Sequence, residues 1–224
     1  MTKLHAFTFN VFGERTYLLD HGDGEATVFD PGMSTKLEQE EFAKFCEKAC
    51  LRPVQCLLTH AHLDHVMGAA WVFERWGIKP RLHPLDLLTY EQAPRAAAVY
   101  GVPMADLPEC GEALASEERI RCGDLELEVL FTPGHAPGHV VFVEHQQAFV
   151  IGGDVLFEGS IGRTDLPGCS PSDLVDSIAD ILFALPEDFE VWPGHGGPTK
   201  IGIEKRSNPF VNAAGTGMMQ RGDA

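Results

Sequence analysis

The first thirty residues alternate between apolar and polar positions or form short apolar runs. The stretches 4–12 and 15–20 are rich in aromatic and β-branched residues, and both are bounded by glycine-containing turns. The stretch 21–30 continues in the same way after His21. This pattern is typical of a meander of short β-strands.

A helical period replaces this alternation from residue 34 onward. In 34–50, apolar residues recur at helical intervals after Ser34, which predicts an amphipathic helix capped by that serine. The apolar run 54–59 predicts a short strand, and 65–77 predicts a helix that ends at Gly77. Strands with interspersed helices therefore make up the first half of the chain.

The second half repeats this order without a legible internal repeat. A strand is expected at 79–84, and the proline-interrupted stretch 85–117 reads as a partly helical insertion or lid. A helix is expected at 171–184, and another begins near Thr199. Strands are expected at 118–123, 125–132, 139–145, 147–153 and 189–194.

Composition limits the class of protein. The chain has 224 residues, of which 44% are hydrophobic, and lacks a serine- or glycine-rich linker, so we expect a single domain over residues 1–224. It has no apolar run long enough to span a membrane, and its start lacks the pattern of a signal peptide, which favours a cytoplasmic protein. Six cysteines without a C-x-x-C pair fit reduced thiols. The net charge of −16 argues against nucleic-acid binding. No feature indicates an oligomeric state.

Three histidines and an aspartate crowd one predicted strand-to-helix turn, in the sequence THAHLDH over 59–65. His60 and His62 are two residues apart and can point the same way in an extended turn. Asp64 and His65 then face a second point nearby. One metal ion cannot easily take all four groups from so short a segment, whereas two adjacent ions can. Burying these groups for packing alone would remove them from water without a compensating interaction.

Further candidate ligands follow other predicted strands, each beside glycine. His135 lies in FTPGHAPGH, Asp154 in VIGGDVLF and His195 in VWPGHGGP. If these strands share one edge, their ends bring the three side chains to the turn at 59–65. His139, four residues after His135, is interpreted as a partner for a ligand or as a structural residue rather than as a ligand, because metal-bound imidazoles need a partner for their other nitrogen.

H-x-H-x-D-H at 60–65, PGH at 133–135, GGD at 152–154 and PGH at 193–195 resemble the motifs of the metallo-β-lactamase superfamily, in the same order. The resemblance implies an α/β fold, a four-layer αβ/βα sandwich with a metal pair at one edge. It also implies the ligand sets. The first metal would be held by His60, His62 and His135. The second would be held by Asp64, His65 and His195, with Asp154 and a hydroxide between the two ions.

The stretches 152–168 and 193–210 are similar to those of short, single-domain hydrolases of the glyoxalase II type. The resemblance implies hydrolysis of thioesters such as S-2-hydroxyacylglutathione by a metal-bridging hydroxide, with catalytic roles for Asp64 and Asp154. Full-length glyoxalase II has a C-terminal helical domain, which we do not expect here. Arg163 stands where family members use a lysine to bind glutathione, and Asp165 stands near the place of a tyrosine. Arg163 is therefore a candidate for substrate binding.

The metal and the exact reaction stay open at this point. Nitrogen and oxygen ligands together suit Zn²⁺, our first choice, and also iron or Mn²⁺. A persulfide dioxygenase of the same fold, with one iron, shares H-x-H-x-D-H and GRTD. Another ester, lactone or phosphoester hydrolase of the superfamily is a further alternative. The expected partner is a small thioester.

Overall fold

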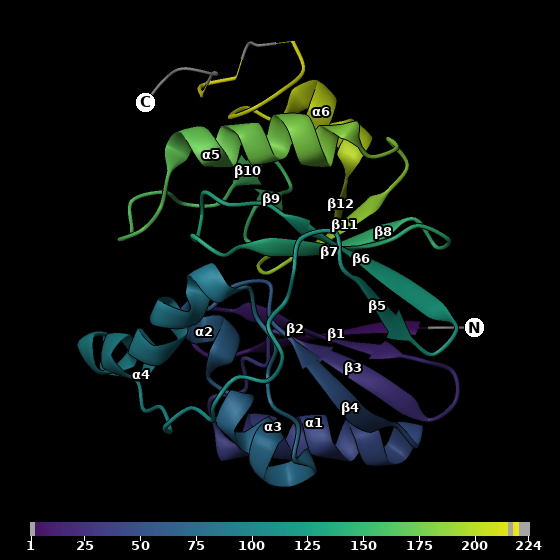
Figure 1. Cartoon of the computed structure of the whole chain (residues 1–224), viewed down its shortest axis with the longest axis vertical. Helices are drawn as coiled ribbons and strands as arrows, with labels where there is room; N and C mark the ends of the chain where they lie inside the picture. Colours follow the sequence, from purple (N-terminus) through teal and green to yellow (C-terminus); the bar gives the residue numbers. More distant parts are fainter. Residues whose placement is uncertain (1–2, 215–216, 220–224) are drawn as a thin grey trace.

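The computed structural model describes residues 3–214 and 217–219. The two ends of the expected domain, residues 1 and 224, lie outside this part. The helices and strands form four layers in the order helix, sheet, sheet, helix, which confirms the predicted sandwich (Figure 1). None of the helices in the described ranges is both long and apolar enough to cross a membrane.

The N-terminal half forms the first sheet and the helices outside it. The sheet order follows the chain, with strands β1 (Lys3–Phe9), β2 (Glu14–Asp20), β3 (Glu25–Phe29) and β4 (Arg52–Leu57). The first three are antiparallel, whereas β3 and β4 are parallel because helix α1 (Lys36–Ala49) connects them. Helices α1 and α3 (Ala69–Trp76) lie over the outer face of this sheet (Figure 1).

The C-terminal half forms the second sheet, in the order β12-β11-β8-β7-β6-β5. Its strands are β5 (Arg119–Cys122), β6 (Leu125–Phe131), β7 (Val140–Glu144), β8 (Phe149–Gly153), β11 (Glu190–Pro193) and β12 (Thr199–Lys200). A short hairpin of β9 (Leu156–Phe157) and β10 (Ser160–Ile161) follows β8. The outer face is covered by α5 (Pro171–Asp176), which continues as irregular helical turns to Ala184, and by α6 (Ile201–Ser207).

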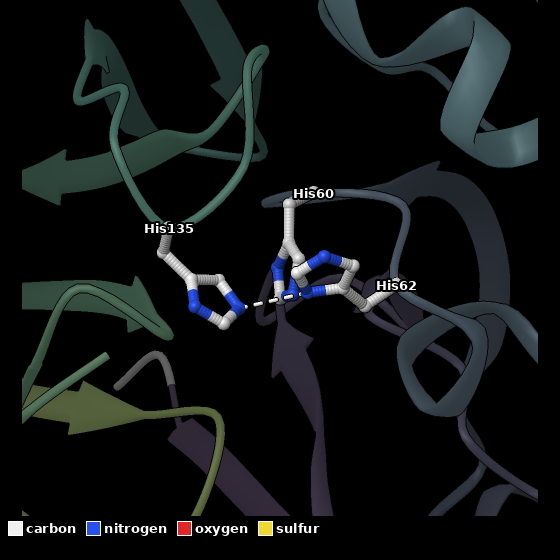
Figure 2. A group of neighbouring side chains, drawn as sticks. All are labelled: His60, His62 and His135. Carbon is white, nitrogen blue, oxygen red and sulfur yellow. Dashed lines mark hydrogen bonds between the residues drawn. The ribbon is translucent and has the colours of Figure 1, made fainter. Parts of the chain in front are cut away.

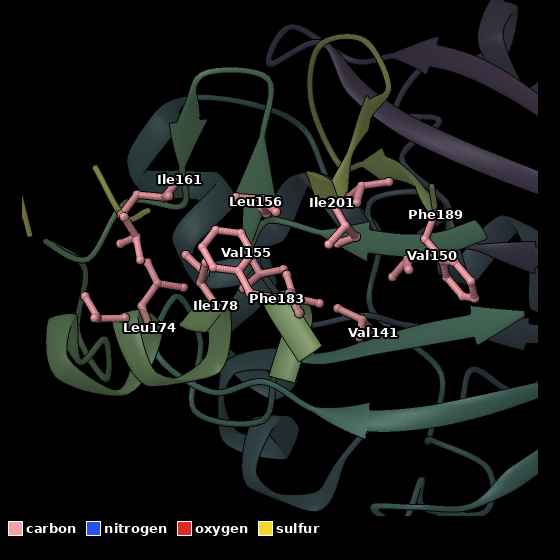
Figure 3. Packing of buried hydrophobic residues seen from close by; sticks show 14 of the residues in the cluster. Val141, Val150, Val155, Leu156, Ile161, Leu174, Ile178, Phe183, Phe189 and Ile201 are labelled. Atoms are coloured by element: carbon pink, nitrogen blue, oxygen red, sulfur yellow. The ribbon is translucent and has the colours of Figure 1, made fainter. Parts of the chain in front are cut away.

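Apolar side chains fill the spaces between the layers. Between the sheets, the rings of Phe29 and Phe142 meet edge to face, with their centres 5.2 Å apart. Outside the second sheet, Leu174, Ile178 and Phe183 of the covering helical segment belong to one buried cluster with Val141 and Val150 of the strands (Figure 3). Burial of this kind stabilises the fold by roughly 1.5–3 kcal/mol for each large side chain. All six cysteines are free thiols, as the sequence predicts.

Two predicted elements are wrong in detail in the first half of the chain. The cap of α1 is Thr35, one residue after the predicted Ser34, because Thr35 and Glu38 form a reciprocal capping box. The strand expected at 79–84 is a single bridge between Arg81 and Leu57. Pro80, directly before Arg81, and Pro84, three residues after it, lack the N–H groups that a longer ladder needs.

Two predicted helices also differ from those observed. The helix expected at 65–77 is divided into α2 (Leu63–Val66) and α3, because Gly68 leaves the helical ladder and donates its N–H to Pro31 O at 2.7 Å. The stretch 85–117 was expected to be interrupted at Pro94. Instead, helix α4 (Leu87–Tyr100) continues through this proline. The proline removes one hydrogen bond of the ladder, but the buried neighbours Tyr90 and Ala97 keep the helix in place.

Candidate metal centre

The proposed ligands meet at one edge of the sandwich, between the two sheets. Strands β6, β8 and β11 run in one direction, so His135, Asp154 and His195 follow their carboxyl ends at a common edge. The turn after β4 reaches this edge from the other sheet. There Thr59 O accepts a hydrogen bond from the N–H of Val140 at 2.8 Å. Both halves of the chain therefore contribute to the site.

Three imidazoles form the first ligand group. His60, His62 and His135 each offer a nitrogen, and the three nitrogens lie within 4.8 Å of one another. Figure 2 shows the rings pointing toward one another, with His135 coming from the opposite loop. Nδ1 of His62 and Nε2 of His135 are 2.8 Å apart. Three converging nitrogens make a face that can hold one cation.

Asp64, His65 and His195 form the second group, again within 4.8 Å of one another. Oδ2 of Asp64 lies 3.1 Å from Nε2 of His195 and 3.7 Å from Nε2 of His65. His65 is buried, whereas His195 is partly exposed. The structure therefore brings together the members of each set that the resemblance implies, and Asp30, His60 and His65 form a further group of the same kind.

Asp154 lies between these two groups. Its Oδ2 is 3.5 Å from Nε2 of His135 in the first group and 3.5 Å from Nε2 of His195 in the second. Its Oδ1 is 3.5 Å from Nε2 of His65. The carboxylate can therefore reach cations at both positions.

Two residues that the sequence reasoning missed orient the histidines. Asp30 accepts hydrogen bonds from the amide and hydroxyl of Thr59, at 2.7 and 2.6 Å. Because the Thr59 hydroxyl donates to Asp30, it accepts from Nδ1 of His60 at 3.0 Å. Nδ1 of His65 contacts the same carboxylate at 3.1 Å. Both rings thus keep Nε2 free for a metal.

Two further partners of the site are a carbonyl and a histidine. Nδ1 of His135 donates to the backbone oxygen of Arg163 at 2.9 Å. His139 accepts the N–H of Asp154 at Nε2, at 3.0 Å, and pairs with Thr132 through Nδ1. His139 therefore supports the backbone of Asp154 and not the ring nitrogen of another histidine.

Burial and neighbouring charges shift the titration of the ligands in opposite directions. Burial, with the surrounding imidazoles, lowers the pKa of His60 well below its usual value, so this ring is neutral and able to bind a metal. Burial alone would also lower the pKa of His65, but Asp154 and Asp64 raise it. Burial would raise the pKa of Asp154, but His65 and His135 lower it, so the carboxylate is ionised.

The unpaired polar atoms of the site fit a pair of metal ions. In the described part of the chain, the buried side-chain atoms without a hydrogen-bond partner are Nε2 of His60, Nε2 of His65, Oδ1 of Asp154 and Oε1 of Glu14. The first three belong to proposed ligands and face the site. Leaving such atoms unpaired costs about 1–3 kcal/mol each, which a bound cation offsets. Burial raises the pKa of Glu14 well above its usual value, and we assign it no ligand role.

Arg163, the proposed substrate-binding residue, lies in the loop that borders His135. Its guanidinium makes two hydrogen bonds to Asp165, at 2.7 and 2.8 Å. Both side chains are more than half exposed. The structure thus places the Arg163 backbone against a ligand and its side chain at the surface.

The fold and the two ligand groups define an α/β sandwich protein with side chains at one edge that can hold metal ions. Residues 10–195 match the Metallo-beta-lactamase superfamily. The chain belongs to this superfamily, which confirms the resemblance seen in its motifs.

Three similar proteins agree with this membership. Hydroxyacylglutathione hydrolase GloC of Haemophilus influenzae is 36% identical over 90% of this chain and 94% of its own length. The crystal structure of BLEG-1 B3 metallo-beta-lactamase has a TM-score of 0.85 and 32% identity, covering 93% of this chain and 99% of that one. The structure of TTHA1623 in a di-iron-bound form has a TM-score of 0.84 and 39% identity, covering 92% and 100%.

Proposed function

We propose that this protein hydrolyses thioesters of the S-2-hydroxyacylglutathione class at a centre of two divalent metal ions. The observation that carries the proposal is the position of Asp154, within 3.5 Å of histidines from both ligand groups. A carboxylate so placed is suited to two ions held side by side. The similarity to GloC, which is named a hydroxyacylglutathione hydrolase, supports the substrate class.

The residues of the site would bind the metal ions and orient the ligand side chains, while the ions would supply the main chemistry. When bound, two adjacent metal ions lower the pKa of a shared water and polarise a carbonyl oxygen. In our proposal His60, His62 and His135 hold one ion, and Asp64, His65 and His195 hold the other. Asp154 contacts both. Asp30 and Thr59 fix the rings in advance, so little reorganisation is needed during the reaction.

Zinc is the metal that we propose first. Mixed nitrogen and oxygen ligands also suit iron and manganese, and metal availability often decides between them. The di-iron-bound form of TTHA1623, which is 39% identical to this chain, supports iron as the second choice.

The function is tested by metal analysis and turnover on the same purified sample. We expect two metal ions per chain and hydrolysis of a glutathione thioester. One iron per chain, with oxygen consumed on glutathione persulfide, would instead identify a persulfide dioxygenase. Faster hydrolysis of a β-lactam than of the thioester would show that the proposed substrate class is wrong.

Arg163 is proposed to bind a carboxylate of the substrate. An exposed ion pair such as that between Arg163 and Asp165 contributes little stability, so the guanidinium can exchange Asp165 for a substrate carboxylate. Guanidinium binds carboxylates through two parallel hydrogen bonds. In a chain of net charge −16, a cation beside the metal edge favours an anionic substrate.

Replacing Arg163 by alanine tests this role, because the backbone oxygen that holds His135 is kept. We expect KM for a glutathione thioester to rise about fivefold, corresponding to roughly 1 kcal/mol for an exposed charged pair. The value of kcat should change less, and a small uncharged thioester should be hydrolysed as before. The matched variant Asp165→Ala removes the same ion pair and should not raise KM. Equal losses in both variants and on both substrates would mean that the pair shapes the loop.

A further inference from the structure

Asp86 is a fully buried carboxylate that the proposed chemistry does not use. It ends a short helical turn (Pro84–Asp86) directly before α4, in the stretch 85–117 whose role the sequence leaves open. A buried acidic side chain is costly unless hydrogen bonds satisfy its oxygens. The hydrogen-bond partners of Asp86 therefore indicate the role of this side chain.

The two oxygens of Asp86 bind two different loops of the metal centre. Oδ2 accepts the amide of Ala61 at 2.8 Å, and Oδ1 accepts the amide of Gly138 at 2.8 Å. Ala61 lies between His60 and His62 in the chain, and Gly138 lies three residues after His135. One carboxylate thus connects the loops that carry the three histidines of the first ligand group.

The surroundings of Asp86 hold it firmly against these loops. A Cβ atom on Gly138 would lie 2.6 Å from the Asp86 nitrogen, so glycine permits this close approach. The amide of Asp86 donates to His83 O at 3.0 Å, and the His83 ring stacks on Phe131, with ring centres 4.6 Å apart. The turn is therefore anchored to the end of β6.

A local helical role does not explain this side chain. Asp86 occupies the N-cap position of α4, where an aspartate usually accepts an amide of the first turn. Here it makes no such hydrogen bond. Its carboxylate accepts hydrogen bonds from the two ligand loops and none from the first turn of α4.

We propose that Asp86 is a positioning residue that sets the spacing between the His60–His62 turn and His135, and thereby the metal affinity of the three-histidine group. This inference rests on the proposed metal centre but not on the choice of substrate. Nδ1 of His62 and Nε2 of His135 are 2.8 Å apart across the two loops that Asp86 joins. Groups that hold metal ligands in place from outside typically contribute about 10–100-fold in metal affinity.

Asp86→Asn tests the proposal with almost no change in size. The amide NH₂ would face one of the two backbone N–H groups, so one loop contact is lost. Titration of metal-free protein with Co²⁺, followed by absorption and by chelator competition, measures each site. We expect the affinity for one of the two ions to fall about 10–100-fold, with an altered Co²⁺ spectrum and the second ion retained. Activity is not needed for this readout.

Glu204→Gln is the matched control, because Glu204 is another buried carboxylate with a backbone amide, Gly159, among its partners. None of those partners is a proposed ligand. We expect this control to bind both ions as the natural protein does. Gly138→Ala should push the Asp86 turn away and so lower the affinity for the same ion as Asp86→Asn does. If Asp86→Asn does not fold, Gly138→Ala takes its place in the test.

Two outcomes would overturn the proposal. One is unchanged affinity for both ions in Asp86→Asn, and the other is an equal loss in Glu204→Gln. The proposed function fails separately, when the natural protein binds two ions but does not hydrolyse thioesters. In that case the role of Asp86 in metal binding is still measured by the Co²⁺ titration.

Discussion

Asp154 lies where the two ligand groups meet, and its carboxylate is buried beside His65, His135 and His195. Replacing it by alanine removes the carboxylate that lies within 3.5 Å of histidines from both ligand groups. We expect Asp154→Ala to lose one metal equivalent and to lower kcat/KM for the thioester by more than about 100-fold, because residues that only support ligands already contribute about 10–100-fold. Metal analysis and turnover on the same sample measure both effects.

Asp188→Ala is a suitable control for Asp154→Ala, because Asp188 is exposed and precedes β11, at the end of that strand opposite to His195. It should keep both metal ions and full activity. Retention of both ions and near-normal turnover in Asp154→Ala itself would show that this carboxylate does not bridge the centre.

At the residue scale, the strand-end pattern predicted which side chains would gather, but not what supports them. Three proposed ligands, His135, Asp154 and His195, stand beside glycine after predicted strands, and the other four crowd the turn at 60–65, so the sequence alone marks them. Asp30 also follows a strand, in VFDPG, yet it lies 29 residues before Thr59 and meets it only through the parallel pairing of β3 with β4. A side chain that acts through a neighbouring strand is recognised once the pairing is known.

The turn after β11 shows how an element positions a ligand. A Cβ atom on Gly194 would lie 2.2 Å from Oδ1 of Asp154 and 2.6 Å from Cε1 of His65. We expect Gly194→Ala to displace these ligands and to reduce thioester turnover by about 100-fold, the order of loss that a displacement of roughly 1 Å causes. The metal content should fall with it, as measured by elemental analysis.

Gly197→Ala provides the control in the same turn. No heavy atom lies within 4 Å of the Cβ position at Gly197, and its backbone is outside the left-handed region, as is that of Gly194. Alanine should therefore be tolerated there with little change in turnover or metal content. A similar loss in both variants would indicate a general effect on the turn rather than a clash with the ligands.

At the element scale, the order of strands and helices was predictable because hydrophobic period and turn residues are local. The errors occur where tertiary contacts decide. Pro94 lies inside α4 because burial of Tyr90 and Ala97 outweighs one missing hydrogen bond. Gly68 separates α2 from α3, where a side chain would collide with Met33. Neither contact is visible in the hydrophobic pattern.

For the whole molecule, the proposed metal centre would join two halves of the fold. His60, His62, Asp64 and His65 follow the first sheet, whereas the other ligands follow strands of the second sheet. Bound ions would therefore connect the two sheets at one edge. They would also offset buried carboxylates in a chain whose net charge is already −16. Metal binding is thus expected to stabilise the entire sandwich as well as the active site.

Removing the metal ions tests this connection. A ligand present at 1,000 times its dissociation constant stabilises the folded state by about 4 kcal/mol. In a domain of this size, each kcal/mol shifts the melting temperature by about 2–4 °C, so chelation should lower Tm by about 8–16 °C for one such site. Addition of Zn²⁺ should restore the loss. The Asp154→Ala variant, expected to hold one ion fewer, should show a smaller shift on chelation. An unchanged Tm after complete loss of metal would show that the ions do not connect the two halves energetically.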